Sequence, residues 1–493
     1  MTDDKTAAAP TNDLIGMADI AQMAGQSRAT VGNWKRRYPD GFPKQRGSSP
    51  RGPLYDAAEV VTWLASQIRP SAEDSDVATA AFEMADTMRA DVPMQEQLPL
   101  ILALLSAGRD IVPGSRISYL DLVNALAQVL DLAGEDVRVL SALNLADRHA
   151  ERLVVIANRI ESPPTLDDIS GLLDRFRLGF GVHDTPLGIA KLMAALAGPG
   201  HAFYDPCLGF GTLLAACSRE GGTSQRQVLA GQEVSSVVAL CARLVFRMLG
   251  IPVDIIVADS LARDVRPGTT YERVVADLPM GQRLLPETLS QEDPRWTFED
   301  PGATGAGPAW IQECLHHLAP SGRAVLLVTP SALFAKARAG RLRQRLIRAD
   351  LLDAVVALPH GLLTHTPVAL ALLIFRRDRP RHGSGAPGPV LIGEIPSTGS
   401  GRARALDEAA ASAFAAGYRA WSDGAEDVPA FSRAVTYSEL AENEFVLQPR
   451  RHVPTATGDA MPGLQELGER LAIALKAAQG AETFIADYLK GPR

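Results

Sequence analysis

The feature that most restricts the fold of this chain is a regular alternation of residue patterns between positions 170 and 378. Short β-branched and aliphatic runs alternate there with stretches in which apolar residues recur at helical spacing. Strands that alternate with helices pair in parallel and are covered on both faces, so this rhythm predicts a doubly wound α/β fold. The expected strands are 201–204, 228–232, 254–257, 273–276, 323–328, 353–357 and 369–375.

A glycine-rich turn follows the first expected strand. Asp205-Pro206-Cys207-Leu208-Gly209-Phe210-Gly211 stands between that strand and a helical stretch that begins at Thr212. Glycines permit a tight turn and a close approach of a ligand to the backbone, and the start of a helix offers free N–H groups. The third glycine of the GxGxxG pattern is missing, which favours S-adenosylmethionine over NAD as the ligand.

Acidic residues end the next two expected strands. Glu233 closes 228–232, where a carboxylate can accept hydrogen bonds from both ribose hydroxyls, and Asp259 follows 254–257, where it could bind an adenine amino group. Ligands of open α/β sheets bind outside the carboxyl ends of the strands, where the glycine turn also lies. The sequence therefore predicts a nucleoside-type cofactor site. The alternative is that Glu233 and Asp259 are only helix caps.

The order of these elements, over most of residues 75–455, resembles the modification subunits of type I restriction-modification systems. Gly181-Val182-His183-Asp184-Thr185-Pro186 resembles the family's "GxxxTP" segment, and the turn from Asp205 to Gly211 resembles its glycine motif. Further similar blocks are 296–300, 305–310, 317–334, 346–377 and 444–451.

This resemblance implies a DNA adenine-N6 methyltransferase with a Rossmann-like, S-adenosylmethionine-dependent fold. It implies that Thr185 and Pro186 pack against the methionine end of the cofactor. The expected cofactor-binding residues are thus Thr185, Pro186, Asp205, Pro206, Gly209, Gly211, Glu233 and Asp259.

The chain departs from this family at the catalytic tetrapeptide. The family has Asn-Pro-Pro followed by Phe or Tyr, with Asp sometimes first, and here the fourth strand ends in Asp277-Leu278-Pro279-Met280. A side-chain oxygen at the first position and a backbone carbonyl at the second hold the adenine amino group for methyl transfer. Asp277 and the carbonyl of Leu278 can still accept these bonds, but Met280 offers no ring on which a flipped base could stack.

Two functions remain open at this point. The first is DNA adenine-N6 methylation with Asp277, Leu278, Pro279 and Met280 as the catalytic set. The second is a catalytically lapsed domain that acts as a DNA-binding regulator or complex subunit. The polar segment 282–307 forms either one wall of a target pocket or a solvent loop.

The N-terminal residues 14–70 resemble a winged helix-turn-helix, with Ile20 and Val31 in its small core and a wing near residues 50–55. Residues that would project from the recognition helix towards DNA are Arg28, Thr30, Asn33, Lys35, Arg36 and Arg37. The alternative is a protein-docking module whose basic residues form a solvated face.

The remaining sections are assigned from composition. Residues 1–13 are expected to be a disordered tail, 75–165 a helical domain, 170–378 the methyltransferase domain, 390–455 a small C-terminal domain and 463–489 a C-terminal helix, with residues 41–53 forming a loop in the N-terminal module. A second basic run, from Lys336 to Arg348, is expected to be solvated, and His316 and His317 are expected to be ordinary helix-end residues.

Charge and cysteine content limit the setting of the protein. The net charge is −8, so any DNA contact must come from local basic patches. The four cysteines include no CxxC pair, which predicts buried thiols and no metal site, and no secretory signal or membrane-spanning run is present. We therefore expect a cytoplasmic protein without membrane contact. The expected partners are double-stranded DNA, specificity or other restriction-modification subunits, and a second copy in a homodimer.

Overall fold

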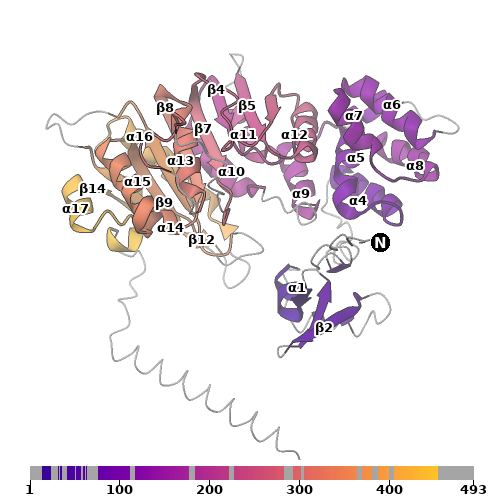
Figure 1. The fold of residues 1–493 in the computed structure, drawn as a ribbon, viewed down its shortest axis with the longest axis horizontal. Coiled ribbons are helices and arrows are strands. Elements are labelled where there is room, and N and C mark those ends of the chain that lie inside the picture. Colours follow the sequence, from indigo (N-terminus) through magenta and orange to yellow (C-terminus); the bar gives the residue numbers. More distant parts are fainter. Residues whose placement is uncertain are drawn as a thin grey trace, which may run out of the picture.

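The computed structural model describes residues 14–23, 31–32, 34–35, 42–49, 52–56, 59–60, 63, 76–111, 117–160, 162–176, 184–220, 227–282, 292–300, 305–362, 369–379, 387–398 and 405–453. Along these residues a small N-terminal unit is followed by a group of helices and then by an α/β part with a large sheet (Figure 1). Within these ranges, no helix is both long and apolar enough to cross a bilayer.

The large sheet has nine strands in the order β14-β11-β9-β10-β8-β7-β4-β5-β6. Strands β4 to β8 are parallel to one another. Strand β10 is antiparallel to both β8 and β9, and β11 is parallel to β9 and antiparallel to β14. The strands are β4 (Ala202–Asp205), β5 (Val228–Glu233), β6 (Asp254–Val257), β7 (Tyr271–Asp277), β8 (Leu318–Val328), β9 (Leu352–Ala357), β10 (Ala371–Arg376), β11 (Val390–Glu394) and β14 (Ser432–Val435).

The predicted doubly wound sheet is confirmed, because every expected strand lies in β4 to β10 with small shifts at its ends. All residues of β10 and all but the last of β9 are buried, as expected for strands covered on both faces. The chain places β5 and β6 on one side of β4 and returns to place β7 and β8 on the other. The order therefore reverses between β4 and β7, which is where open α/β sheets bind ligands.

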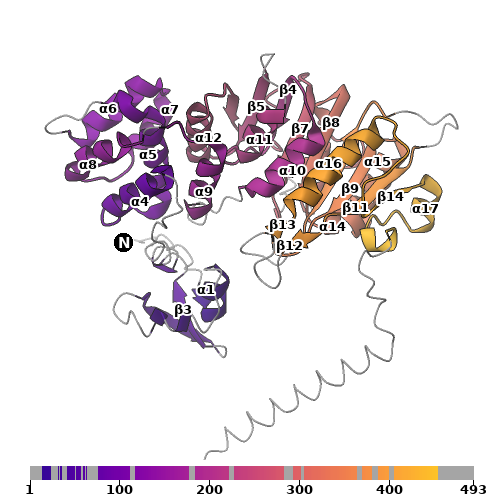
Figure 2. The same ribbon diagram turned by 180° about the vertical axis from the view of Figure 1, so that it is seen from behind.

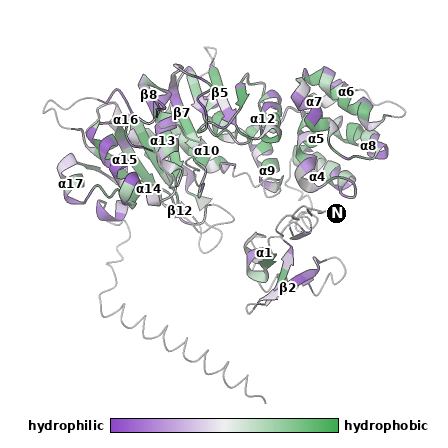
Figure 3. Cartoon of the chain, viewed as in Figure 1, coloured by the Kyte–Doolittle hydropathy of each residue, from purple (hydrophilic) through white to green (hydrophobic). Residues whose placement is uncertain are grey.

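Helices cover both faces of the sheet (Figures 1 and 2). One apolar cluster joins one face to α10 (Leu187–Ala197), α11 (Thr212–Glu220), α12 (Ser236–Met248) and α16 (Glu408–Ser422). A second joins the other face to α13 (Gly307–His316), α14 (Ser331–Phe334), α15 (Ala337–Arg348) and α17 (Tyr437–Glu442). The 3-10 turn η4 (Pro449–Arg451) contacts β9 and β11. The strands and the buried helices α10 and α12 are largely hydrophobic (Figure 3), so burial of apolar surface drives this layering.

Between residues 76 and 176, the residues that the structure describes form helices and no strand. The helices are α4 (Asp76–Met88), α5 (Met94–Ala107), η1 (Gly108–Asp110), α6 (Tyr119–Leu130), α7 (Gly134–Ser141), α8 (Asp147–Ala157) and α9 (Leu166–Phe176). Helix α5 packs on α12, and both contribute to one apolar cluster. An ion pair from Arg243 of α12 to Asp136 of α7, at 3.0 Å, fastens these helices to the edge of the α/β part.

The N-terminal unit combines α1 (Met17–Met23) with the strands β1 (Leu14–Gly16), β2 (Gln45–Ser49) and β3 (Gly52–Asp56). Ile20 and Val31 are buried in its small core, as expected. The prediction of a loop over 41–53 is wrong for residues 45–49 and 52–53, because β2 and β3 pair there as an antiparallel hairpin. Gly52, at φ +125°, permits the chain to reverse direction between the two strands.

The hairpin lies at the position expected for a wing. Of the predicted DNA contacts, Lys35 is described, and its Nζ donates to the hydroxyl of Tyr55 at 2.9 Å. Arg28, Thr30, Asn33, Arg36 and Arg37 lie outside the described residues. The helix-turn-helix thus stays a prediction.

The part of the chain from residue 390 adds β11 and β14 to the edge of the large sheet, next to β9. The short strands β12 (Ser397–Thr398) and β13 (Ala405–Leu406) pair with each other. Tyr418 of α16 donates to Asp353 at 2.7 Å, which ties this part to β9. The tail 1–13 and the helix 463–489 lie outside the described residues.

Candidate active site

The glycine turn between β4 and α11 is tight. Gly209 and Gly211 have φ values of +56° and +88°, which other residues rarely adopt. A Cβ on Gly211 would lie 2.6 Å from Cε2 of Phe246, so a side chain cannot fit there without movement. The N–H of Leu208 donates to the carbonyl of Gln232 at 2.9 Å and fixes the turn against β5.

Glu233 lies at the end of β5 and holds the glycine turn directly. Its Oε2 accepts from the N–H of Gly209 at 3.1 Å, and its Oε1 accepts from the N–H of Ser235 at 2.9 Å. Burial raises the pKa of this carboxyl above its ordinary value. Each carboxylate oxygen can accept a further hydrogen bond, so capping and ribose binding are compatible roles for Glu233.

Asp259 caps the turn after β6. Its Oδ1 accepts from the N–H of Leu261 at 2.9 Å and of Ala262 at 3.2 Å. This is the capping arrangement that the sequence left as the alternative, and it leaves Oδ2 for other contacts. The neighbouring Ser260 donates from Oγ to the carbonyl of Pro206 at 2.5 Å, which joins this loop to the glycine turn.

Asp277 ends β7, on the opposite side of β4 from Glu233. Its backbone carbonyl accepts from Sγ of Cys207 at 3.3 Å, and its Oδ2 accepts from Oγ1 of Thr185 at 3.0 Å. The catalytic and cofactor-binding residues predicted from distant positions therefore meet at the switch point. Pro186 follows Thr185 and begins α10 as its N-cap residue.

Two contacts at this site were not predicted. The hydroxyl of Thr212, the first residue of α11, donates to Oδ2 of Asp184 at 2.8 Å, and both residues are buried. The bond from Ser260 to Pro206 is the second. Asp184 stands directly before the Thr-Pro pair, but its partner is 28 residues away, so no local pattern reveals the bond. Cys217, Cys241 and Cys314 are buried, as expected. Cys207 is partly exposed as a residue, but burial raises the pKa of its thiol well above the ordinary value, so the thiol itself is buried as expected.

The two aspartates at the switch point share an unusual electrostatic environment. Burial raises the pKa of Asp277 to about 7, although the Thr185 hydroxyl opposes this. Burial also raises the pKa of Asp205 to about 7, and the charge of Asp277 adds to the effect. Carboxyls that titrate near neutral pH are typical of functional sites.

The other residues of the tetrapeptide line a cavity of about 580 Å³. Leu278 is buried and donates its N–H to the carbonyl of Leu327 at 3.2 Å, while Pro279 is exposed. Met280 is partly buried against the apolar cluster on the α10 face. Residues of α13, α14 and α15, together with Gln282, Gly305 and Ala306, also line this cavity. The described ends of segment 282–307 therefore line a cavity, and residues 283–291 and 301–304 lie outside the described residues.

The basic residues of α15 are not simply solvated, which corrects the sequence expectation. Arg341 and Arg345 pair with Glu299 at 2.7 and 2.9 Å, and Arg338 pairs with Asp300 at 2.9 Å. The Arg341 contact holds the pKa of Glu299 below its ordinary value. These pairs attach the segment after the tetrapeptide to α15.

Arg343 of the same helix is buried. It donates to the carbonyls of Phe445, Ala332 and Ala335, and burial lowers its pKa to about 10.

Comparisons with known proteins identify the class of this site. The chain resembles the solved type I restriction-modification methyltransferase subunit of Streptococcus thermophilus, with a TM-score of 0.60 and 17% identity, over 77% of this chain and 99% of that one. This likeness shows a Rossmann-like methyltransferase fold. Residues 179–460 match the sequence model of the N-6 DNA Methylase family. The chain belongs to the N-6 DNA methylase family.

Curated relatives are named as methylase subunits. The methylase subunit of the HindI type I restriction enzyme, from Haemophilus influenzae, is 28% identical over 308 residues, which cover 59% of this chain and 68% of the relative. The MjaVIII methylase subunit, from Methanocaldococcus jannaschii, is 26% identical over 301 residues. That match spans 54% of this chain and about half, 52%, of the relative.

Proposed function

We propose that this protein is a DNA adenine-N6 methyltransferase that uses S-adenosylmethionine as its methyl donor. The observation that carries the proposal is the position of Asp277. Its carboxyl lies at the end of β7, across the switch point from the glycine turn, and its backbone is bonded to Cys207 of that turn. A group that binds the target amino nitrogen thus stands beside the expected cofactor loop, as methyl transfer requires.

The cofactor-binding residues fit a nucleoside with a charged amino-acid end. The glycine turn leaves backbone without side chains next to the start of α11, and Glu233 and Asp259 follow the next two strands with free acceptor capacity. Asp205, Pro206, Thr185 and Pro186 complete the set. S-adenosylmethionine would supply an electrophilic methyl group here.

The tetrapeptide would position the target base. The Asp277 carboxylate accepts one N–H of the adenine amino group, and the backbone carbonyl of Leu278 accepts the other. These bonds draw the nitrogen lone pair out of conjugation with the ring. Thr185 holds Oδ2 of Asp277, and none of the other described residues donates to this carboxylate, so Oδ1 is the oxygen that would face the amino group.

The cavity next to the tetrapeptide suits a flipped base. Its volume of about 580 Å³ and largely apolar walls would accept an adenine extruded from the duplex. Pro279 and Met280 are among the residues that line it. Met280 provides apolar contact without an aromatic ring, so weaker stacking is expected than in relatives with Phe or Tyr.

The proposed partners follow from the family. Double-stranded DNA is the substrate, and the relatives named as methylase subunits of type I enzymes support a separate specificity subunit. The N-terminal unit would add DNA contacts through Lys35 and its neighbours Arg28, Thr30, Asn33, Arg36 and Arg37. A homodimer and a cytoplasmic location belong to the same proposal.

Sequencing of modified bases tests the proposal. The chain is expressed in a host without DNA methylation, and genomic DNA is read by single-molecule sequencing. We expect N6-methyladenine at one defined motif, and its loss with Asp277→Ala. An unmodified genome, in cells that also contain a specificity subunit, would sink the enzymatic proposal.

The second candidate function is DNA binding without catalysis. It is favoured by the two departures in the tetrapeptide, where Leu278 and Met280 replace a proline and an aromatic residue. Under this function the protein would bind DNA and cofactor, and no substitution at Met280 would produce methylation.

A further inference from the structure

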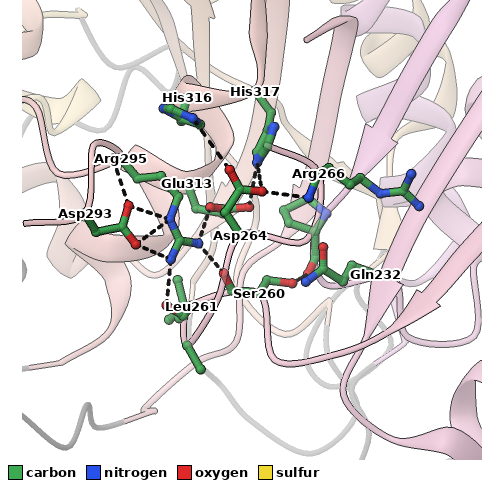
Figure 4. Close-up of polar contacts among 12 residues, drawn as sticks. Gln232, Ser260, Leu261, Asp264, Arg266, Asp293, Arg295, Glu313, His316 and His317 are labelled. Carbon is green, nitrogen blue, oxygen red and sulfur yellow. Dashed lines mark hydrogen bonds and ion pairs between the residues drawn. The ribbon is translucent and has the colours of Figure 1, made fainter. Parts of the chain in front are cut away.

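A fully buried arginine lies in the segment that follows the tetrapeptide. The Arg295 side chain has no solvent exposure. Nε and Nη2 donate to Asp293, Nη1 donates to Glu313 at 2.8 Å and to the carbonyl of Ser260, and Nη2 donates to the carbonyl of Leu261 at 3.0 Å (Figure 4). These bonds use all five N–H groups that a guanidinium carries.

The two carbonyl contacts lead to the predicted cofactor site. Ser260 and Leu261 directly follow Asp259, and the N–H of Leu261 is itself bonded to the Asp259 carboxylate. Ser260 also bonds to Pro206 of the glycine turn. Arg295 thus holds the backbone of the loop after β6 directly behind Asp259.

The remaining contacts fix the arginine itself. Asp293 and Glu313 supply two carboxylates, and Glu313 is anchored in α13 with almost no exposure. His317 lies one turn further along, and its Nε2 is 3.3 Å from Oε1 of Glu313 and 3.6 Å from Oδ1 of Asp264. Nε2 of His316 is 3.8 Å from Oδ2 of Asp264. Burial disfavours the charged form of His317, but these carboxylates together raise its pKa. His317 is the C-cap residue of α13, so it lies at a helix end as expected, and it is also part of a buried charge network.

The geometry points to Arg295 as a positioning residue for the cofactor: it sets the place of the Asp259 loop and joins it to the segment that follows the catalytic tetrapeptide. This inference rests on the proposed function for its link to S-adenosylmethionine. A lysine carries three donors on a single nitrogen, so it cannot bind two separated carbonyls and two carboxylates together. A substitution that keeps the positive charge, such as Arg295→Lys, therefore does not keep the loop in place.

A matched arginine that follows β10 provides the control. Arg379 has 6% side-chain exposure and also binds two carboxylates, those of Asp353 at 2.8 Å and Asp350 at 2.5 Å, together with the carbonyl of Pro389. It lies beside β9 and β11, away from the β6 loop. Arg379→Lys and Arg379→Gln should lower the melting temperature to an extent comparable with the same changes at Arg295, without disturbing the Asp259 loop.

Hydrogen exchange of the full chain without cofactor tests the positioning itself. We expect the peptide that contains residues 258–262 to exchange about tenfold faster in Arg295→Lys and Arg295→Gln, because the carbonyl anchors of the loop are lost. Arg379→Lys should leave this peptide unchanged. Equal protection of the peptide in wild type and in the Arg295 variants would overturn the inference, whatever the protein does with cofactor.

Calorimetric titration with S-adenosylmethionine then tests the consequence. We expect the Kd to rise about tenfold in Arg295→Lys, and by much less when Asp259→Ala is already present, because the two residues act through one loop. Equal Kd values in wild type and Arg295→Lys, or fully additive effects with Asp259→Ala, would contradict the role of Arg295. No binding by the wild type would instead contradict the proposed function, and the exchange result would still decide the positioning.

Discussion

The two sides of the switch point follow the pattern of the family to different degrees. On the side of β4, β5 and β6, the glycine turn, Glu233 and the Asp259 loop are joined by direct hydrogen bonds. On the side of β7, the first residue of the tetrapeptide, Asp277, is hydrogen-bonded to the hydroxyl of Thr185. The second and fourth residues, Leu278 and Met280, replace a proline and an aromatic residue. The comparison indicates that binding of the cofactor and acceleration of the transfer are separable properties of this site.

The largest effect is expected from removing the Asp277 carboxyl. Asp277→Ala should lower methyl transfer by on the order of a hundred- to a thousandfold, because the oxygen that accepts the amino N–H is lost. Affinity for S-adenosylmethionine should change little, since Glu233 and the glycine turn are untouched. Transfer of labelled methyl groups to DNA and calorimetry measure the two quantities. An equal loss of methyl transfer and of cofactor affinity would contradict the separation between the β7 side and the β4–β6 side of the site.

The next effect concerns the glycine turn. Gly211→Ala places a Cβ 2.6 Å from Phe246 at φ +88°, so we expect destabilisation of about 1–3 kcal/mol and loss of cofactor binding. Gly424→Ala is the control, because Gly424 also has a positive φ (+107°) but a Cβ added there would have no atom within 4 Å. Thermal unfolding and calorimetry compare the variants. Unchanged cofactor affinity in Gly211→Ala would mean that the turn does not hold the ligand.

An increase in the methyl-transfer rate is expected from a substitution at Met280, the fourth residue of the tetrapeptide. Met280→Phe restores a stacking surface for the base, which corresponds to about a ten- to hundredfold increase in transfer rate. Met280→Leu adds no ring and should change the rate little. Persistent inactivity of Met280→Phe, with cofactor bound, would favour the DNA-binding function without catalysis.

The smallest effect is a pH dependence. Burial raises the pKa of Asp277 to about 7, and its ionised form is the better acceptor, so transfer should rise with pH through about pH 7 and level off about one pH unit above it. Asp277→Asn keeps an acceptor oxygen without a proton to lose. Because the titrating group that accepts the amino N–H is then gone, the profile should be flat between about pH 6 and 8. A wild-type profile that is already flat would show that this carboxyl does not control the rate.

Much of this architecture could be predicted from local patterns, and the limits have a physical origin. The strands that meet at the site are continuous apolar runs, and the glycine turn and the acids after β5 and β6 are visible as short motifs. The partner of Asp277 is Thr185, 92 residues away, and the two backbone carbonyls that Arg295 binds are 34 and 35 residues away. Such contacts depend on which strand lies next to which, and local periodicity does not specify this.

The same limit explains the C-terminal part and helix α15. Residues 390–394 have the composition of a strand, but their pairing with β9 is set by the folded sheet. The arginines of α15 were expected to face solvent because their partners, Glu299 and Asp300, belong to a segment without regular structure. In both cases the residue types are ordinary, and their role comes from a neighbour that is distant in sequence.

The central claim is that one site at the β4–β7 switch point binds the methyl donor and the target base. Calorimetric titration of the folded wild-type chain with S-adenosylmethionine, followed by the same titration of Gly211→Ala and Asp277→Ala, tests it most directly. The account predicts binding of one cofactor per chain in the wild type and in Asp277→Ala, and none in Gly211→Ala. A folded wild-type protein that shows no binding, or equal binding in all three proteins, would contradict it.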